Sequence, residues 1–226
     1  SRLRRLGMRD QVAAGTFHSV ALAQLRTWWR ENDRREPDLV DRKISMIRSR
    51  LPRDHRATAA LDVVSEIEWA QARRIRPAAY APSAEAAGRT PPLPAPTVAR
   101  IYEDYEQEKA DRNMVDFDDL LDQCRHYLTT DRRFANAQRW RFQHLYVDEF
   151  QDVNPLQFDL LAAWLGGRTE LCVVGDPDQA IYGWNGAEGE QPFDKTREHQ
   201  AGLFLEIEGL AFEPHENMIY TDLLNK

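Results

Sequence analysis

Residues 144–176 read HLYVDEFQDVNPLQFDLLAAWLGGRTELCVVGD. A short apolar run ending in acids comes first, a helical pattern with Pro155 in its first turn follows, and a second apolar run ends in Gly-Asp. The order strand, helix, strand predicts a parallel βαβ unit and an α/β fold. Ligands bind at the carboxyl edge of the strands in such sheets. The residues predicted at this edge are Asp148, Glu149, Gly175 and Asp176.

The whole chain has 226 residues, of which 42% are hydrophobic and 30% charged, so it is long enough to bury a sizeable core. No apolar run approaches the length of a membrane span, and the first ten residues lack the apolar core of a signal peptide. Two cysteines, Cys124 and Cys172, are too few for a disulfide framework or a four-ligand zinc site, and we expect both to be reduced packing residues. We therefore expect a soluble, cytoplasmic protein with no membrane partner.

Charge is divided unevenly along the chain. Residues 1–76 carry 17 Lys and Arg against 10 Asp and Glu, whereas residues 77–226 carry 13 against 27. The net charge of −7 therefore hides a basic first third. Because a polyanion responds to the local field, this division permits nucleic-acid binding along one face without requiring it.

The segments on the amino-terminal side of the βαβ unit are predicted to be mainly helical. Residues 11–15 fit a buried strand that runs into an amphipathic helix, and an Arg-rich helical pattern covers residues 35–76. The proline-rich residues 77–97 are predicted to form a surface loop or stiff connector. A helix is expected over residues 98–110.

A further helix is predicted in MVDFDDLLDQCRHYL, residues 114–128, with Asp116 as its N-cap. Asp118 and Asp119 are interpreted as solvated acids of its first turn. The predicted buried face consists of Phe117, Leu120, Leu121, Cys124 and Leu128. The sheet core is predicted to contain Val147, Val173 and Val174.

Adjacent acids at the end of an apolar strand suit a magnesium-nucleotide site. One carboxylate, Asp148, can hold the hydrated metal, and the other, Glu149, can take a proton from an attacking water. The alternative is a strand end with solvated acids, followed by Asp152 or Asn154 as the cap of the next helix.

The second predicted strand leads into GDPDQAIYGWNGA, residues 175–187, which adds further candidate groups. The Gln179 amide suits a terminal phosphate or the attacking water, and Tyr182 and Trp184 offer flat faces on which a base can stack. The neighbouring glycines allow close approach of backbone to a ligand. The alternative for Trp184 is packing against the sheet.

Taken together, four segments resemble the UvrD/PcrA/Rep type of superfamily 1A DNA helicases. They are GTFHS at 15–19, DFDDLL at 116–121, VDEFQD at 147–152 and GDPDQAIYGWNGA at 175–187, in the family's order. The resemblance implies a RecA-like, P-loop NTPase-type parallel sheet with helices, interrupted by an α-helical inserted subdomain. The implied divisions are 1–34 and 111–188 for a partial motor domain (1A), 35–110 for the inserted subdomain (1B) with the proline-rich loop 77–97, and 189–226 for an unassigned acidic tail.

The same resemblance implies a role for each matching position. Asp148 is the implied Walker B ligand of Mg²⁺, Glu149 the catalytic base for ATP hydrolysis, and Gln179 the sensor of the γ-phosphate. The implied DNA-binding residues are Phe17, His18, Tyr182, Trp184 and Asn185. The alternative for Phe17 is a core aromatic and that for His18 a hydrogen bonder at a helix start. Asn185 stands where many relatives carry Arg.

The sequence also departs from the family. None of its four lysines lies in a GxxxxGK[ST] loop, and there is no second motor domain to supply an arginine finger. The first residue is Ser1, so we expect a piece of a longer protein that does not hydrolyse ATP by itself.

The resulting prediction for the parent protein is an ATP-dependent 3′–5′ DNA helicase or translocase in DNA repair or replication. It uses ATP and Mg²⁺, acts on single-stranded DNA or a 3′-tailed duplex, and is cytoplasmic and nucleoid-associated. One alternative is a non-catalytic, degenerate helicase module that binds single-stranded DNA or a protein partner. Another is a metal-dependent nuclease, which requires Asp116, Asp118, Asp148 and Glu149 to converge on two metals.

Overall fold

The computed structural model describes residues 15–55 and 59–175. Its helices are α2 (Phe17–Glu31), α3 (Lys43–Arg50), α4 (Ala60–Ala72), α5 (Pro77–Ala86), α6 (Ala95–Asp111), α7 (Phe117–Thr130), α8 (Arg132–Arg141) and α9 (Pro155–Leu165), with short 3-10 turns at Arg53–His55 and Phe150–Asp152. Its strands are β1 (Asp38–Leu39), β2 (Met114–Val115), β3 (Leu145–Val147) and β4 (Leu171–Val173). None of the helices in these ranges is long and apolar enough to cross a membrane.

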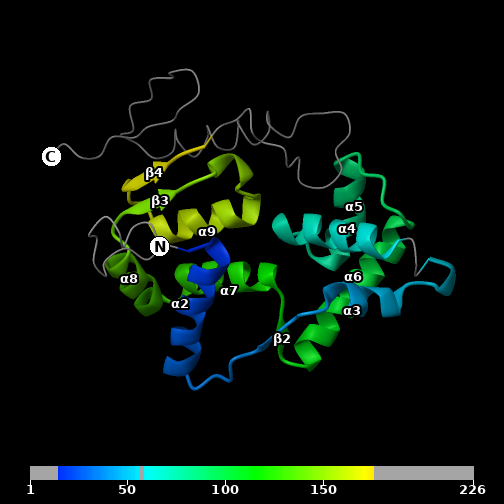
Figure 1. Cartoon of the computed structure of the whole chain (residues 1–226), viewed down its shortest axis with the longest axis horizontal. Helices are drawn as coiled ribbons and strands as arrows, with labels where there is room; N and C mark the ends of the chain where they lie inside the picture. Colours follow the sequence, from blue (N-terminus) through cyan, green and yellow to red (C-terminus); the bar gives the residue numbers. More distant parts are fainter. Residues whose placement is uncertain (1–14, 56–58, 176–226) are drawn as a thin grey trace, which may run out of the picture.

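The predicted parallel βαβ unit is present. β3 and β4 pair in parallel, with Tyr146 opposite Cys172 in the middle of the pair. The crossover helix α9 begins as its sequence indicates, because Asn154 forms a capping box with Gln157 and Pro155 occupies the first turn. α9 in turn packs on α7, and α7 packs on α2 (Figure 1).

Two separate hydrophobic cores divide the described residues. We call α2, α7, α8, α9, β3 and β4 the sheet half, whose core includes Leu25, Leu121, Leu160 and Val173. We call α3, α4, α5 and α6 the helical half, whose core includes Ile47, Ile67, Tyr80 and Ile101. Figure 1 shows the two halves side by side. The division into domains 1A and 1B stays a prediction.

The chain passes between the halves through a pair of very short strands. β1 leads from the sheet half to the helical half, β2 leads back, and they pair in parallel with Asp38 opposite Met114 and Leu39 opposite Val115. The chain therefore leaves and re-enters the sheet half at neighbouring points.

The prediction of a loop over residues 77–97 was wrong. Residues Pro77–Ala86 form helix α5, which packs against α6, and α6 itself begins at Ala95. Pro77 is tolerated because the first helical position needs no backbone donor. Tyr80 is fully buried and its hydroxyl donates to Glu66 at 2.6 Å, so tertiary packing outweighs the unfavourable Pro82 inside the helix.

Two other burial predictions were also wrong. Phe117 is 55% exposed because it is the first residue of α7, so its ring lies at the end of the apolar face rather than within it. Val174 is 43% exposed because it follows the last residue of β4. The other predicted core residues, namely Leu120, Leu121, Cys124, Leu128, Val147 and Val173, are buried.

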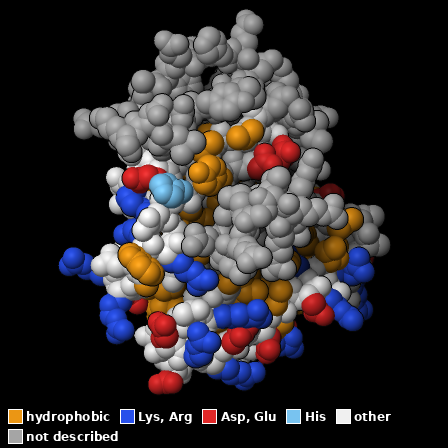
Figure 2. All heavy atoms as spheres, turned by 60° about the vertical axis from the view of Figure 1, so that its left-hand side comes forward, with side chains coloured by type: hydrophobic (Ala, Val, Ile, Leu, Met, Phe, Trp, Pro, Cys, Tyr) orange, Lys and Arg blue, Asp and Glu red, His pale blue; other side chains and the backbone are white. Residues whose placement is uncertain are grey.

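The surface carries many accessible cations. Figure 2 brings the left side of Figure 1 forward and shows Lys and Arg side chains spread over this face. Helix α8 contributes exposed Arg132, Arg133 and Arg141, together with Trp140, which is 78% exposed. The predicted strand over residues 11–15 lies outside the described residues except for Gly15.

Candidate nucleotide and DNA site

The end of β3 carries two exposed acids. Asp148 follows the last residue of the strand, and its Oδ1 accepts the backbone N–H of Glu149 at 3.0 Å. Glu149 lies in the left-handed region with φ 53° and ψ 43°, which is uncommon and unfavourable for a residue other than glycine. Gln151 Nε2 donates to Glu149 Oε2 at 2.6 Å and holds one side of that carboxylate. A strained turn therefore presents both carboxylates to solvent.

The end of β4 lies directly beside this turn. Val174 donates its N–H to the Val147 carbonyl at 2.8 Å, and Phe150 donates to the Val174 carbonyl at 2.9 Å. A Cβ added at Gly175 would lie 2.5 Å from Gln151 Oε1 and 3.0 Å from the Phe150 nitrogen. A side chain at this position would crowd the backbone of Phe150 and Gln151, so the close approach of the two segments favours glycine. Asp148, Glu149 and Gly175 share one edge, as the βαβ pattern indicated.

This edge has the donor set that a magnesium-nucleotide complex needs. Carboxylate oxygens are preferred ligands of Mg²⁺, and both acids are accessible. The adjacent Asp152 has a buried Oδ1 that accepts no hydrogen bond from the part of the chain that the structure describes. The residues present therefore fit a hydrated cation at this edge.

The GTFHS segment forms the start of α2. Thr16 caps the helix by accepting the Ser19 N–H at 3.2 Å. The half-buried Phe17 ring stacks on Trp164 of α9, with centroids 5.8 Å apart. His18 packs edge-on against Phe117, with centroids 5.4 Å apart. GTFHS and DFDDLL, far apart in sequence, therefore meet through one aromatic contact.

Burial also sets the protonation of His18. It lowers the pKa of the imidazole below its usual value. At neutral pH the ring is therefore mostly uncharged, so it offers a flat face and one N–H rather than a cation. The remaining predicted site residues, Gln179, Tyr182, Trp184 and Asn185, lie outside the described residues.

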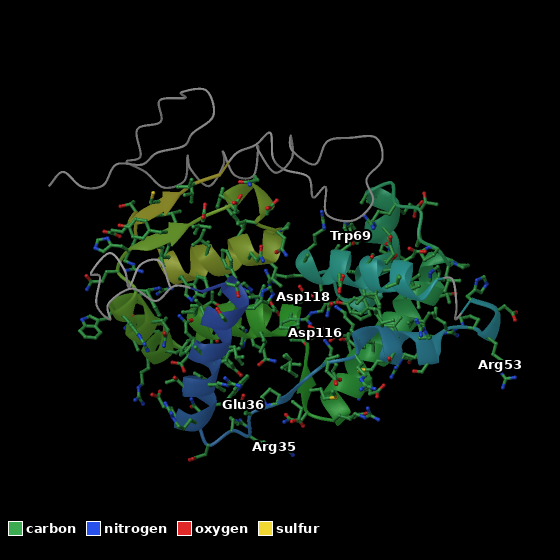
Figure 3. The ribbon with its side chains drawn as sticks, viewed as in Figure 1. Arg35, Glu36, Arg53, Trp69, Asp116 and Asp118 are labelled. Carbon is green, nitrogen blue, oxygen red and sulfur yellow. The ribbon has the colours of Figure 1, made fainter. Side chains whose placement is uncertain are left out.

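Asp118 and Asp119 at the start of α7 are not the solvated acids that the sequence predicted, because their side chains are only 19% and 24% exposed. Asp116 is the predicted N-cap, and it forms a capping box with Asp119. Its Oδ2 also accepts from Gln71 Nε2 and the Tyr105 hydroxyl, each at 2.8 Å, and from Lys109 Nζ at 3.0 Å. Figure 3 places Asp116 and Asp118 between the two halves.

The two lysines in this cluster neutralise the acids around them. Lys109 Nζ lies 2.6 Å from Asp119 and 3.0 Å from Glu106, and Lys43 Nζ lies 3.6 Å from Asp118. Burial favours a raised pKa for Asp116, but Lys43 and Lys109 outweigh it and hold the pKa below its usual range. Burial and the Asp116 charge raise the pKa of Asp119 to about 7.

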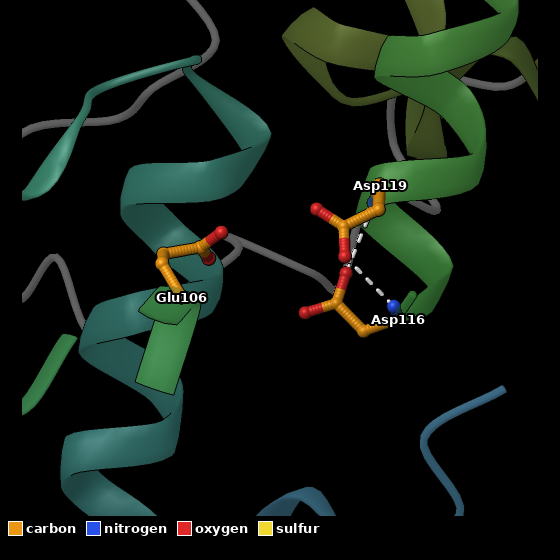
Figure 4. Close-up of side chains that lie close together, drawn as sticks. All are labelled: Glu106, Asp116 and Asp119. Atoms are coloured by element: carbon orange, nitrogen blue, oxygen red, sulfur yellow. Dashed lines mark hydrogen bonds between the residues drawn. The ribbon is translucent and has the colours of Figure 1, made fainter. Parts of the chain in front are cut away.

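The nuclease alternative is not supported by this geometry. Figure 4 shows Glu106, Asp116 and Asp119 close together, and their ligand atoms lie within 4.8 Å of one another. Lys109 already supplies the cation for these three carboxylates. Neither Asp148 nor Glu149 joins any such acidic group among the described residues.

Of the residues in this cluster, Lys109 is the one that the helical pattern of the sequence could have revealed. It lies on the apolar stripe of α6, in register with Ile101, Tyr102 and Tyr105, and it is only 2% exposed. A lysine at such a position needs a buried acidic partner, which the helical pattern alone does not identify.

Known proteins resemble this chain over most of its length. The family model described as UvrD/REP helicase N-terminal domain matches residues 1–200. The ATP-dependent DNA helicases UvrD2 of Mycobacterium tuberculosis and Mycobacterium bovis are 37% identical over 225 residues, which cover 92% of this chain and 32% of theirs. The ATP-dependent DNA helicase PcrA of Staphylococcus aureus is 35% identical over 117 residues, covering 48% of this chain and 15% of PcrA.

The chain thus spans about a third of the length of the UvrD2 proteins it matches. The family match extends over the four motif segments quoted from the sequence, and the family implies the RecA-like α/β fold, of which the structure shows a small parallel sheet among many helices. The resemblance predicted from those motifs is confirmed: the chain belongs to the UvrD/REP helicase N-terminal domain family.

Proposed function

We propose that this chain is the nucleotide- and DNA-contacting part of an ATP-dependent 3′–5′ DNA helicase that acts on single-stranded DNA or 3′-tailed duplexes in DNA repair or replication. The observation that carries this proposal is the pair of exposed acids, Asp148 and Glu149, at the carboxyl edge of β3 beside Gly175. The relatives' names describe ATP-dependent DNA helicases. A cytoplasmic, nucleoid-associated location follows from the same proposal.

In this proposal the two acids divide the chemistry. Asp148 would hold the Mg²⁺, and the bound cation would supply the positive charge that offsets the charge of the ATP phosphates. Glu149 accepts the proton of the attacking water at Oε1, since Oε2 is held by the Gln151 amide. Gln179 contacts the γ-phosphate. Both side chains are accessible on the strained turn at Glu149.

The DNA contacts are assigned to aromatic groups. Phe17 and His18 lie at the start of α2, and Tyr182, Trp184 and Asn185 complete the proposed set. Because His18 is mostly neutral, it contributes by ring contact, and the phosphates are attracted by exposed arginines such as those of Figure 2.

ATP hydrolysis is a property we assign to the longer parent protein. The sequence contains no GxxxxGK[ST] loop to cradle the phosphates, so we expect this chain to bind DNA without turning over ATP.

The test uses the parent protein with Glu149→Gln. We expect DNA-stimulated ATP hydrolysis to fall by about 10²- to 10⁴-fold, the usual contribution of a general base, while affinity for an oligo-dT strand stays within about twofold. The matched control is Glu103→Gln, an exposed acid on α6, which should leave hydrolysis unchanged. Equal hydrolysis rates for the Glu149 and Glu103 variants would overturn the proposal. A parent that binds oligo-dT but hydrolyses no ATP would favour the non-catalytic module instead.

A further inference from the structure

Asp116 divides its two carboxylate oxygens between the two halves of the molecule. Oδ1 accepts the Asp119 N–H at 2.9 Å and caps α7 in the sheet half. Oδ2 accepts from Gln71 of α4 and from Tyr105 and Lys109 of α6, all in the helical half. One side chain therefore joins three helices from both halves.

This carboxylate is buried together with its partners. Asp116 is 3% exposed, Gln71 7% and Lys109 2%. Lys43, at the start of α3, adds a second cation 3.7 Å from Oδ2. A buried charge is tolerated only when it is paired and hydrogen-bonded, so the cluster holds its partners at fixed positions.

Within the described residues, the halves are also joined where α4 packs against α9 and α7. Their hydrophobic cores share no residue. Arg74, at the end of α4, reaches Asp122 of α7 and Asp159 of α9 at 3.2 Å each, but its side chain is 43% exposed, and exposed ion pairs are weak. Besides these pairs, β1 and β2 contribute a ladder only two residues long. The Asp116 cluster is therefore the most deeply buried polar connection between the described parts of the two halves.

We propose that Asp116 is a positioning residue that locks the helical half onto α7. A second effect, which rests on the proposed function, concerns DNA binding. The residue after Asp116, Phe117, packs on His18, which is one of the proposed DNA contacts. A hollow of about 710 Å³ beside Phe117 has walls from both halves, including Ile44 and Leu61 of the helical half. Its shape depends on how the halves are aligned.

The test replaces Asp116 without removing the helix cap. Asn is as good an N-cap as Asp, so Asp116→Asn keeps the bond to the Asp119 N–H. It removes the charge paired with Lys43 and Lys109. In place of Oδ2 it puts an NH₂ group, a donor, against the donors of Gln71, Tyr105 and Lys109. The matched control is Asp131→Asn, because Asp131 caps α8 through Arg133 and Phe134 but contacts neither lysine.

The measurement is urea unfolding of the full 226-residue chain, followed for each helix by pulsed hydrogen exchange and mass spectrometry. In the wild-type chain and in Asp131→Asn, we expect peptides from α4 and α6 to unfold at the same urea concentration as peptides from α7 and α9. In Asp116→Asn, the two sets of midpoints should separate. Separate midpoints in the wild type, or coincident midpoints in Asp116→Asn, would overturn the proposal.

A milder variant covers the case in which Asp116→Asn does not fold. Tyr105→Phe removes one donor to Oδ2 and keeps both the charge and the cap. We expect a smaller separation of the same sign, and coincident midpoints in this variant would then decide against the lock.

Affinity for oligo-dT gives the second readout, with an expected loss of at least threefold for Asp116→Asn and none for Asp131→Asn. If the midpoints separate but the affinity for oligo-dT is unchanged, Asp116 joins the two halves but does not influence DNA binding. If the wild-type chain binds no DNA, the proposed function fails, whereas the exchange measurement still decides the lock.

Discussion

The acids at the end of β3 and the acids at the start of α7 differ in how many hydrogen bonds and ion pairs their carboxylate oxygens already make. Asp148 and Glu149 are exposed and lie on a strained turn. Asp116 is buried and accepts four hydrogen bonds, two of its neighbours being lysines. Chemistry with a metal and water requires accessible oxygens, whereas holding helices together requires saturated ones. Acidic side chains are therefore available to bind a metal at the end of β3, whereas at the start of α7 they hold helices together.

Removing the central cation should produce the largest effect. Lys109→Met leaves Glu106, Asp116 and Asp119 close together without their shared ammonium. We expect the free energy of unfolding at pH 7 to fall by about 3–5 kcal/mol, as for other buried pairs that lose one partner. Urea denaturation followed by circular dichroism measures this difference. A loss below about 1 kcal/mol would mean that the cluster is not cohesive.

The pH dependence of stability should separate Asp119 from the exposed acids. Burial and the charge of Asp116 raise the pKa of Asp119 to about 7, well above its unfolded value. Between about pH 4 and 7 the Asp119 carboxyl is therefore protonated in the folded state and ionised in the unfolded state. This proton uptake stabilises the folded state at low pH, and the stabilisation is lost as pH rises from about 4 through 7. Between pH 5 and 8 the wild type should lose at least about 1 kcal/mol relative to Asp119→Asn. Parallel stability curves would contradict this assignment.

Much of the sheet half could be predicted from the sequence because its signals are local. Asn154 and Pro155 mark the start of α9, and the acids follow directly on β3. The Asp116 cluster could not be predicted in this way, since Gln71 and Asp116 are 45 residues apart and only the packing of α4 and α6 brings them together. The error at α5 has the same cause, because burial of Tyr80 overrides the local preference of proline.

The strain at Glu149 offers a test of the opposite kind, in which a substitution at the site stabilises the fold. Glycine adopts φ 53° without a Cβ clash, so Glu149→Gly should raise the free energy of unfolding by about 0.5–1 kcal/mol. Glu103→Gly, in the helical conformation of α6, should lower it by about 1 kcal/mol. Thermal denaturation of both variants gives the comparison. Destabilisation at both positions would show that the turn at Glu149 is not strained.

The smallest effect on stability is expected at Asp148, where the comparison with Asp116 is most direct. Asp148→Asn keeps an oxygen that can accept the Glu149 N–H, and its other atoms face solvent. The free energy of unfolding should therefore change by less than about 0.5 kcal/mol, against several times that for Asp116→Asn. Binding of Mg²⁺ with nucleotide by the parent protein, measured by titration calorimetry, should nevertheless weaken at least tenfold, since an amide is a poorer ligand than a carboxylate. A large loss of stability without a loss of Mg²⁺ affinity would place Asp148 with the cohesive acids and leave the β3 edge without its metal ligand.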